Sequence, residues 1–278
     1  MAAAPQAGRP AQASGGTVNG RPRLSVIVIT RNAGRHLAAC LASVDFADEC
    51  VVLDSGSDDD TLAIARAHGA RVECSADWPG FGAQKNRVLA LASGDWVLSL
   101  DADECVTPEL AQEILQVLAA PAHVAYDMPR LSKFCGRYMR HGGWWPDRVL
   151  RLFRRGQARF TDARVHEKLV AEGSVGHLRW HLLHDTHADL DEAIAKINRY
   201  STDSAQVLHA RGKRANLPGA VGHGVWTFIR MYFLRLGLLD GRHGFVLATV
   251  TAMGSYARYA KLMFLNDEAR RERATPPR

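Results

Sequence analysis

The residues best suited to chemistry are Asp101 and Asp103, which directly follow an apolar segment at 96–100. Two other apolar segments also end in polar residues, at 30–32 and at 54–58. Open parallel sheets bind ligands at the carboxyl ends of their strands, so these polar ends are expected to share one crevice. Carboxylates gathered there would repel one another unless a cation lay among them. Mg²⁺ or Mn²⁺ bridging a diphosphate fits this arrangement, because both ions prefer oxygen ligands. A solvated acidic turn is the plainer interpretation, and the coincidence of three polar strand ends favours the ligand site.

The elements that must position these residues alternate along the first 120 positions. Short β-branched segments predict strands at 24–30, 50–53, 71–74 and 96–100, and amphipathic segments predict helices at 34–44, 60–67, 82–92 and 107–118. This alternation is typical of a doubly wound, mostly parallel α/β sheet. The segment 24–30 is apolar at nearly every position, as expected of a strand buried on both faces.

The rest of the chain is less regular. Short strands are predicted near 126–128, 149–153, 164–170 and 178, followed by helices at 191–211, 220–239 and 245–265. Residues 240–244 (Asp-Gly-Arg-His-Gly) are expected to interrupt the last two helices.

Composition indicates an ordinary globular protein, with 278 residues of which 47% are hydrophobic and 23% charged. Residues 1–22 are rich in Ala, Gly, Pro and Gln without an apolar period, which predicts a disordered tail. The tail lacks the apolar core of a signal peptide, so we expect a cytoplasmic protein. The five cysteines are scattered and include no C-x-x-C pair, which argues against a zinc ribbon or a redox pair.

The net charge of +6 reflects basic residues late in the chain. There, aromatic and aliphatic residues at 226–234 are interspersed with Arg230 and Arg235. This pattern favours a helix lying on an anionic membrane surface, although a helix packed on the protein's own core is the alternative. We expect no spanning helix, since no apolar run reaches about 20 residues. We also expect no nucleic-acid partner, because the charges carry no nucleic-acid-binding motif.

Four motifs together resemble the family 2 glycosyltransferases with a GT-A fold: residues 24–32, Asp54-Ser-Gly-Ser-Asp58, Gln84-Lys-Asn86, and Asp95-Trp96 leading to Asp101-Ala-Asp-Glu104. Within that family the chain resembles the bacterial branch that builds the lipopolysaccharide core, the glucosyltransferase group. Looser matches at 144–146, 148–153, 165–167, 239–241 and 244–245 extend the resemblance to nearly the whole chain after the tail.

This resemblance implies a GT-A-like doubly wound, mostly parallel sheet with a helical C-terminal extension. It implies a donor-binding half at 23–120, an acceptor and catalytic half of the same domain at 121–189, and a helical basic region at 190–278. The implied reaction is metal-dependent, inverting transfer of a hexose, with glucose expected, from a UDP-sugar to a lipopolysaccharide core sugar. The implied partners are the nucleotide sugar, a lipid A-core glycolipid and the cytoplasmic face of the inner membrane.

The resemblance also implies roles for individual residues. Thr30, Asn32 and Asp54 should hold the uracil and ribose, while Ser55 and Asp58 shape the same loop. Lys85 should neutralise phosphate charge, and Asn86 and Ala102 belong to the same donor-site motifs. Asp101 should lie near the ribose and the metal, Asp103 should bind the metal directly, and His184 is a candidate for a further metal ligand.

Inversion in a single displacement requires a general base, usually an Asp or a Glu. Glu167 is the first choice, and Asp162 and Asp147 are the alternatives. Trp144 and Trp145 are candidates for stacking on the acceptor sugar. Core packing is an equally good explanation for one of them, because adjacent residues in an extended segment point in opposite directions.

Two other functions stay open at this point. The first is a transferase with another acceptor, such as a polyprenyl phosphate or a capsule sugar. The second is a nucleotide-sugar-binding protein without catalysis. A redox nucleotide enzyme is disfavoured, because the first strand is followed by Thr30-Arg-Asn-Ala-Gly34 and not by G-x-G-x-x-G.

Overall fold

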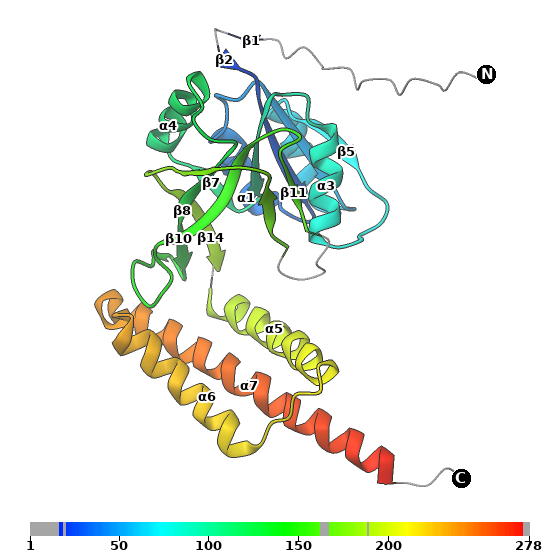
Figure 1. Ribbon diagram of the computed structural model, residues 1–278, viewed down its shortest axis with the longest axis vertical. Coiled ribbons are helices and arrows are strands. Elements are labelled where there is room, and N and C mark those ends of the chain that lie inside the picture. The colour runs from blue at the N-terminus through cyan, green and yellow to red at the C-terminus, as the bar shows by residue number, and fades with distance from the viewer. Residues whose placement is uncertain (1–16, 19–20, 162–166, 188, 275–278) are drawn as a thin grey trace, which may run out of the picture. The chain divides into compact units, whose positions relative to one another are not determined.

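The computed structural model describes residues 17–18, 21–161, 167–187 and 189–274, which form two compact units (Figure 1). Unit 1 takes in the described residues of Met1–Ala102, Ala111–Asp127 and Leu150–Leu178. Unit 2 takes in those of Asp103–Leu110, Met128–Val149 and Arg179–Arg278. The two units interleave along the chain, and the four-part division expected from the sequence stays a prediction.

Unit 1 contains a mostly parallel sheet. Four of its strands run parallel in the order β5-β4-β3-β6, and residues 152–154 of β10 pair antiparallel with β6. Every residue of β3 is buried, as predicted for a strand covered on both faces. The strands are β3 (Leu24–Thr30), β4 (Glu49–Asp54), β5 (Arg71–Cys74), β6 (Trp96–Asp101) and β10 (Asp147–Arg154).

One face of this sheet packs on α3 (Phe81–Leu91). Ile27, Ile29 and Val97 form a core there with Val88 of the helix and with Phe153. Neighbouring residues in β3 point to the opposite face, because side chains alternate along a strand. Three further helices lie among or after these strands in sequence: α1 (Gly34–Ala42) follows β3, α2 (Thr61–Ala67) follows β4, and α4 (Pro108–Ala119) comes after β6. The predicted alternation of strands and helices is therefore confirmed.

Several short strands were not predicted, or were predicted only in part, because three residues are too few to show a period. β11 (Ala158–Phe160) pairs antiparallel with β12 (Leu169–Ala171), and β13 (Val175–His177) runs parallel to the first residues of β8 (Ala125–Phe134). A two-residue pair, β1 (Thr17–Val18) with β2 (Arg21–Pro22), precedes the main sheet. The predicted strand at 164–170 overlaps β12 only in part, and residues 162–166 lie outside the described residues.

Unit 2 contains strand pairings that matter for the site. β14 (Leu182–His187) is antiparallel to β7 (Glu104–Val106) and parallel to β8, while β9 (Arg137–Tyr138) pairs antiparallel with β8. This register places His184 opposite Glu104 on one side and opposite Ser132 on the other.

The helices of unit 2 follow β14 (Figure 1). Glycines allow α5 and α6 to approach α7 closely: a Cβ atom on Gly254 would lie 2.6 Å from Ile197, and one on Gly224 would lie 3.1 Å from Tyr256. No helix in the described part of the chain is long and apolar enough to cross a membrane. The helices are α5 (Leu190–Ala210), α6 (Leu217–Ile229), a π-helical turn η1 (Arg230–Leu234), a 3-10 turn η2 (Gly237–Asp240) and α7 (Gly241–Ala274).

The expected interruption at 240–244 is wrong in one respect. Asp240 ends η2, and Gly241 already begins α7, so residues 241–244 form its first turn. A Cβ atom on Gly244 would lie 1.9 Å from the carbonyl oxygen of Gly237. Gly244 therefore permits close packing of α7 against η2, whereas its residue type alone suggested a helix break.

Candidate active site

Asp54 organises the loop at the end of β4. Its carboxylate is buried and accepts hydrogen bonds from Thr30 Oγ1 at 2.8 Å, Ser57 Oγ at 2.5 Å, the N–H of Ser57 at 2.8 Å and the N–H of Gly56 at 3.0 Å. Burial opposes ionisation, but these hydrogen bonds, led by those from Ser57, hold the pKa of Asp54 below its usual value. Asp54 is thus an ionised carboxylate that fixes the polar loop.

The other residues predicted at this edge meet in the same loops. Asn32 adopts a left-handed conformation with φ of 52°, and its Oδ1 accepts the N–H of Asp58 at 3.0 Å. Ser55 Oγ accepts a hydrogen bond of 2.9 Å from the buried side chain of Gln84. The structure therefore brings together the ends of β3 and β4, as expected from the sequence.

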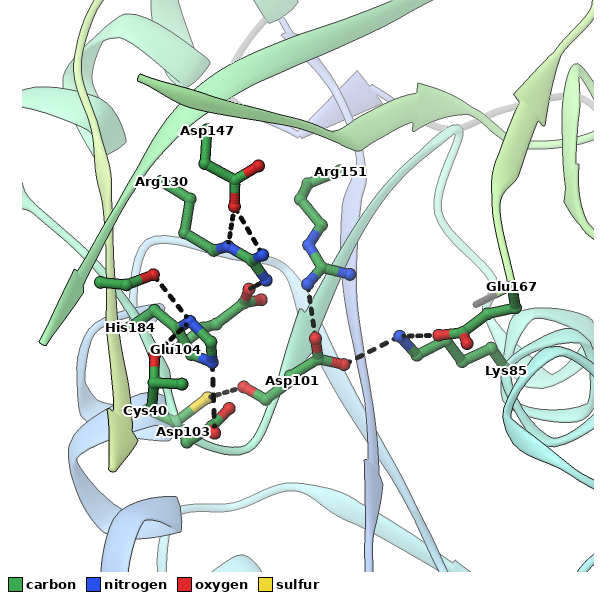
Figure 2. A network of polar contacts seen from close by, with 12 residues as sticks. Cys40, Lys85, Asp101, Asp103, Glu104, Arg130, Asp147, Arg151, Glu167 and His184 are labelled. Atoms are coloured by element: carbon green, nitrogen blue, oxygen red, sulfur yellow. Dashed lines mark hydrogen bonds and ion pairs between the residues drawn. The ribbon is translucent and has the colours of Figure 1, made fainter. Parts of the chain in front are cut away.

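Four charged side chains of unit 1, Lys85, Asp101, Arg151 and Glu167, form what we call the Lys85 cluster (Figure 2). Lys85 Nζ lies 2.8 Å from Asp101 Oδ1 and 2.9 Å from Glu167 Oε1, and Arg151 Nη2 lies 2.5 Å from Asp101 Oδ2. The Lys85 side chain is only 4% exposed, so it is a buried cation and not a solvated helical lysine.

The charges of the Lys85 cluster determine the state of Asp101. Burial disfavours its ionised form, but the positive charges of Arg151 and Lys85 outweigh burial and hold the pKa of Asp101 well below its usual range. Both oxygens of Asp101 are engaged by cations. Sequence reasoning missed Arg151, although a charged residue inside the apolar strand segment 149–153 was a usable signal.

Two further residues of the predicted donor motifs have local roles. The Asn86 amide donates to the carbonyl of Phe160 and accepts its N–H, both at 2.9 Å, and so fastens α3 to β11. Ala102 lies in the two-residue turn between β6 and β7. The alternative base Asp162 lies outside the described residues.

In unit 2, Asp103 faces His184: His184 Nε2 lies 3.4 Å from Asp103 Oδ2 (Figure 2). The other ring nitrogen, Nδ1, lies 3.1 Å from Ser132 Oγ and 2.9 Å from Thr186 Oγ1. Hydrogen bonds of this kind fix the ring and direct its second nitrogen outward, as around metal-binding histidines.

This pair fits a divalent cation. Mg²⁺ and Mn²⁺ sites commonly use one or two protein ligands together with phosphate oxygens and water. Among the residues that the structure describes, no three His, Cys, Asp or Glu side chains are grouped to hold a metal. Asp101, expected to join Asp103 and His184, is instead engaged by Lys85 and Arg151.

Arg130 on β8 holds two carboxylates of unit 2. Its Nε and Nη2 donate to Asp147 Oδ2 at 3.0 and 2.6 Å, and its Nη1 donates to Glu104 Oε1 at 3.3 Å. Glu104 is fully buried, whereas the Asp147 side chain is 42% exposed. The Asp147 and His184 side chains border one cavity of about 230 Å³, which we call the Asp147 cavity. It is lined by Arg130, Ser132, Gly143, Trp144, Asp147, His184 and Thr186.

The two adjacent tryptophans belong to different surroundings. Trp144 meets Phe134 edge to face, with ring centroids 6.0 Å apart, and lines the Asp147 cavity. Trp145 lines another cavity and meets His181 edge to face at 5.7 Å. Only Trp144 therefore lines the same cavity as Asp147 and His184.

Residues 25–169 match the family model described as glycosyl transferase family 2. The lipopolysaccharide core biosynthesis glycosyltransferase LpsC of Rhizobium meliloti is 32% identical over 261 residues, which cover 85% of this chain and 93% of LpsC. An uncharacterized glycosyltransferase of Rickettsia typhi is 28% identical over 261 residues, which cover 89% of each protein.

Two solved structures are similar. Residues 1–349 of TarS from S. aureus are 14% identical, with a TM-score of 0.45 over 89% of this chain and 92% of that one. Glucosyl-3-phosphoglycerate synthase from Mycobacterium tuberculosis, solved with Mn²⁺, UDP and glucosyl-3-phosphoglycerate, is 31% identical, with a TM-score of 0.34 over 41% of this chain and 45% of that one. On the strength of the family match over more than half of its length and of the identity to LpsC, the chain belongs to glycosyl transferase family 2 and has a GT-A-like fold.

Proposed function

We propose that the chain is an inverting, metal-dependent glycosyltransferase that moves a hexose, with glucose as the first candidate, from a UDP-sugar to a hydroxyl group of a lipopolysaccharide core sugar. The observation that carries this proposal is the Asp147 cavity, which joins an exposed carboxylate to the oriented ring of His184. Family membership supports the reaction class, and the name of LpsC supports the acceptor class.

On the donor side, we propose that the uracil and ribose bind at the loops that follow β3 and β4. Support comes from Asp54, whose hydrogen bonds hold the loop, and from Asn32, whose left-handed conformation places its backbone N–H against Ser57. In the Lys85 cluster, two cations balance two carboxylates. The Lys85 cluster itself therefore adds no net negative charge where the diphosphate would approach.

We propose Asp103 and His184 as the protein ligands of Mg²⁺ or Mn²⁺. A bound divalent ion would offset the negative charge that develops on the departing diphosphate. The contribution of the chain itself is orientation: Ser132 and Thr186 hold the imidazole, and β14 carries it opposite β7.

For the general base we now prefer Asp147 to Glu167. Glu167 is 16% exposed and ion-paired with a buried lysine, so its carboxylate is committed to the Lys85 cluster. Asp147 borders a cavity, and Arg130 holds it through Oδ2. In the proposed step the acceptor oxygen bonds to the anomeric carbon as the bond to the phosphate oxygen breaks. UDP leaves with that electron pair, and the acceptor proton passes to the Asp147 carboxylate.

We further propose that the segment 221–245 rests on an anionic membrane surface. It exposes several large apolar side chains, while Asp240, which is buried, is the only acidic residue between positions 211 and 265. Exposed apolar side chains flanked by basic ones favour such an interface. The large apolar side chains are Val221, Val225, Trp226, Ile229, Phe233, Leu234, Leu236, Leu238, Leu239 and Phe245.

Vesicle sedimentation tests the membrane surface. The wild-type chain should bind vesicles that contain phosphatidylglycerol, and binding should fall when Trp226 and Phe233 are both replaced by Ser. Equal sedimentation of the two proteins would remove this part of the proposal.

The transfer reaction is tested with purified protein, UDP-glucose, Mn²⁺ and a truncated lipid A-core acceptor. We expect UDP release together with a product heavier by one hexose. Loss of this product in Asp147→Asn, and its retention in Asp267→Asn, which alters a half-exposed residue of α7, would support the proposed base. UDP-glucose binding without transfer to any lipid-linked or capsule acceptor would instead indicate a nucleotide-sugar-binding protein.

A further inference from the structure

A second cavity of unit 2, of about 440 Å³, has a lining unlike that of the Asp147 cavity. Its polar side chains are basic or aromatic, and its rim is apolar, with Leu234 and Leu236 exposed to 62% and 51%. Arg140 and Arg235 line it from two segments nearly a hundred residues apart. We call it the Arg140 cavity; the lining residues that matter here are Arg140, His141, Trp145, Leu234, Arg235 and Leu236.

The two arginines are not neutralised by carboxylates. In the part of the chain that the structure describes, neither guanidinium group forms an ion pair with a carboxylate; that of Arg140 lies 6.0 Å from the ring centroid of Trp145. Asp240 contacts the same loop but is only 3% exposed. Its carboxylate accepts the N–H groups of Arg140 and His141, at 3.2 and 2.8 Å, and lies 3.0 Å from His141 Nδ1. The positive charge of the Arg140 cavity is therefore available to a ligand.

The walls of this cavity are fixed by the backbone. The N–H of Gly142 donates to the carbonyl of Arg235 at 2.8 Å, which joins the two segments. A Cβ atom on Gly143 would lie 2.2 Å from Arg235 Nη1, so a side chain at this position would displace the guanidinium group, and the φ of 84° also favours glycine. Leu236 has a φ of 55°, a left-handed conformation that leucine rarely adopts and that persists only where its surroundings impose it.

We propose that the Arg140 cavity binds a phosphate group carried by a lipid or a lipid-linked molecule. Guanidinium groups present planar sets of donors that match phosphate oxygens. The exposed leucines beside Arg235 suit the apolar part of the same molecule. Gly143 lines both cavities, so a ligand anchored at the arginines lies next to the Asp147 cavity. This site goes beyond sugar transfer, and its test needs no donor, so its failure would leave the proposed reaction intact.

The test is calorimetric titration of the full chain with two probes. Dihexanoyl phosphatidic acid, kept below its micelle concentration, represents a lipid-borne phosphate, and inorganic phosphate represents the bare anion. The pocket variant Arg140→Gln/Arg235→Gln is compared with a control of equal charge, Arg211→Gln/Arg214→Gln, whose arginines are exposed in unit 2, lie outside segment 221–245 and do not line the cavity. Near-ultraviolet circular dichroism verifies that both variants keep their tertiary structure.

We expect saturable one-site binding of the lipid probe by the wild-type chain. The pocket variant should bind at least about tenfold more weakly, as expected when hydrogen bonds to a charged group are lost, and the control variant should keep the wild-type affinity. Tighter binding of the lipid than of inorganic phosphate assigns the site to lipid-borne phosphate, whereas equal binding assigns it to a soluble phosphate compound. Absence of saturable binding of both probes, or equal weakening in both variants, would overturn the proposal.

Discussion

The Lys85 cluster of unit 1 and the Asp147 cavity of unit 2 are built from similar residues in different ways. In the cluster, Lys85 and Arg151 bond Asp101 and Glu167, and the two cations are almost fully buried. In the cavity, Asp147 and His184 border open space while Arg130, Ser132 and Thr186 hold them. The difference indicates that the Lys85 cluster stabilises the fold, whereas side chains that border the Asp147 cavity can contact a substrate.

The most direct test of this comparison is to replace Asp147 and Glu167 separately by their amides. We predict that Asp147→Asn lowers kcat for sugar transfer by about 10²–10⁴-fold, the usual contribution of a general base. Glu167→Gln should retain most of kcat, because Glu167 is bonded to Lys85. Steady-state kinetics with UDP-glucose provide the measurement. A large loss of kcat in Glu167→Gln with little change in Asp147→Asn would reverse the assignment.

Replacement of Lys85 tests whether the Lys85 cluster stabilises the fold. We predict that Lys85→Met lowers the free energy of unfolding by about 3–5 kcal/mol, because Asp101 and Glu167 lose the cation they share. The matched control is Arg71→Ala, which breaks an ion pair whose side chains are 50% and 43% exposed. Loss of that exposed pair should cost about 0–1 kcal/mol. Urea denaturation gives the free energy of unfolding of both variants, and equally small losses would show that the Lys85 cluster does not stabilise the fold.

The orientation of His184 should affect metal affinity without affecting the fold. We predict that Ser132→Ala combined with Thr186→Val weakens Mn²⁺ binding by about 10–100-fold, since both hydroxyl groups hold Nδ1 of the ring. Thr202→Ala on α5 is the control. Calorimetric titration with MnCl₂ gives the affinities. Unchanged Mn²⁺ binding in the double variant would place the metal elsewhere.

The smallest expected effect is on acid stability. The pKa of Asp101 is lowered from its ordinary value of 3.8, so the folded state binds fewer protons there than the unfolded state does. The stabilisation is therefore complete above that ordinary pKa and is lost as the pH falls below it, by at most about 1.4 kcal/mol per pH unit. Unfolding midpoints in urea between pH 5 and 3 should decline less steeply in Asp101→Asn. Parallel declines in the two proteins would contradict the effect of the cations on Asp101.

Sequence patterns predicted unit 1 well because three of its four parallel strands, β3, β4 and β6, each carry their own apolar run and polar end. Thr30 and Asp54 are the polar last residues of β3 and β4, and they mark where these strands end and their loops begin. The partners of Asp101 were harder to predict. Arg151 reaches Asp101 from β10, an antiparallel strand some fifty positions later, and no local period encodes that pairing.

In unit 2 the difficulty was different, because residue type was a poor guide to role. Gly244 suggested a helix break, yet it allows close packing against Gly237. Glu167 of unit 1 and Asp147 of unit 2 were both acidic residues near predicted strands, and both are ion-paired. Exposure distinguishes them, because the Glu167 side chain is 16% exposed, whereas that of Asp147 is 42% exposed and borders a cavity. Because adjacent residues in an extended chain point in opposite directions, the two tryptophans were expected to have different surroundings, and they do line separate cavities.

The most direct test of the donor site is calorimetric titration of UDP-glucose, first with Mn²⁺ and then with EDTA. Wild-type protein, Asp103→Ala and the control Asp267→Asn should be compared under the same conditions. We predict that the wild type and Asp267→Asn bind UDP-glucose only with Mn²⁺, and that Asp103→Ala does not bind it. Binding that persists in EDTA, or that is unchanged in Asp103→Ala, would contradict the proposed metal-assisted donor site.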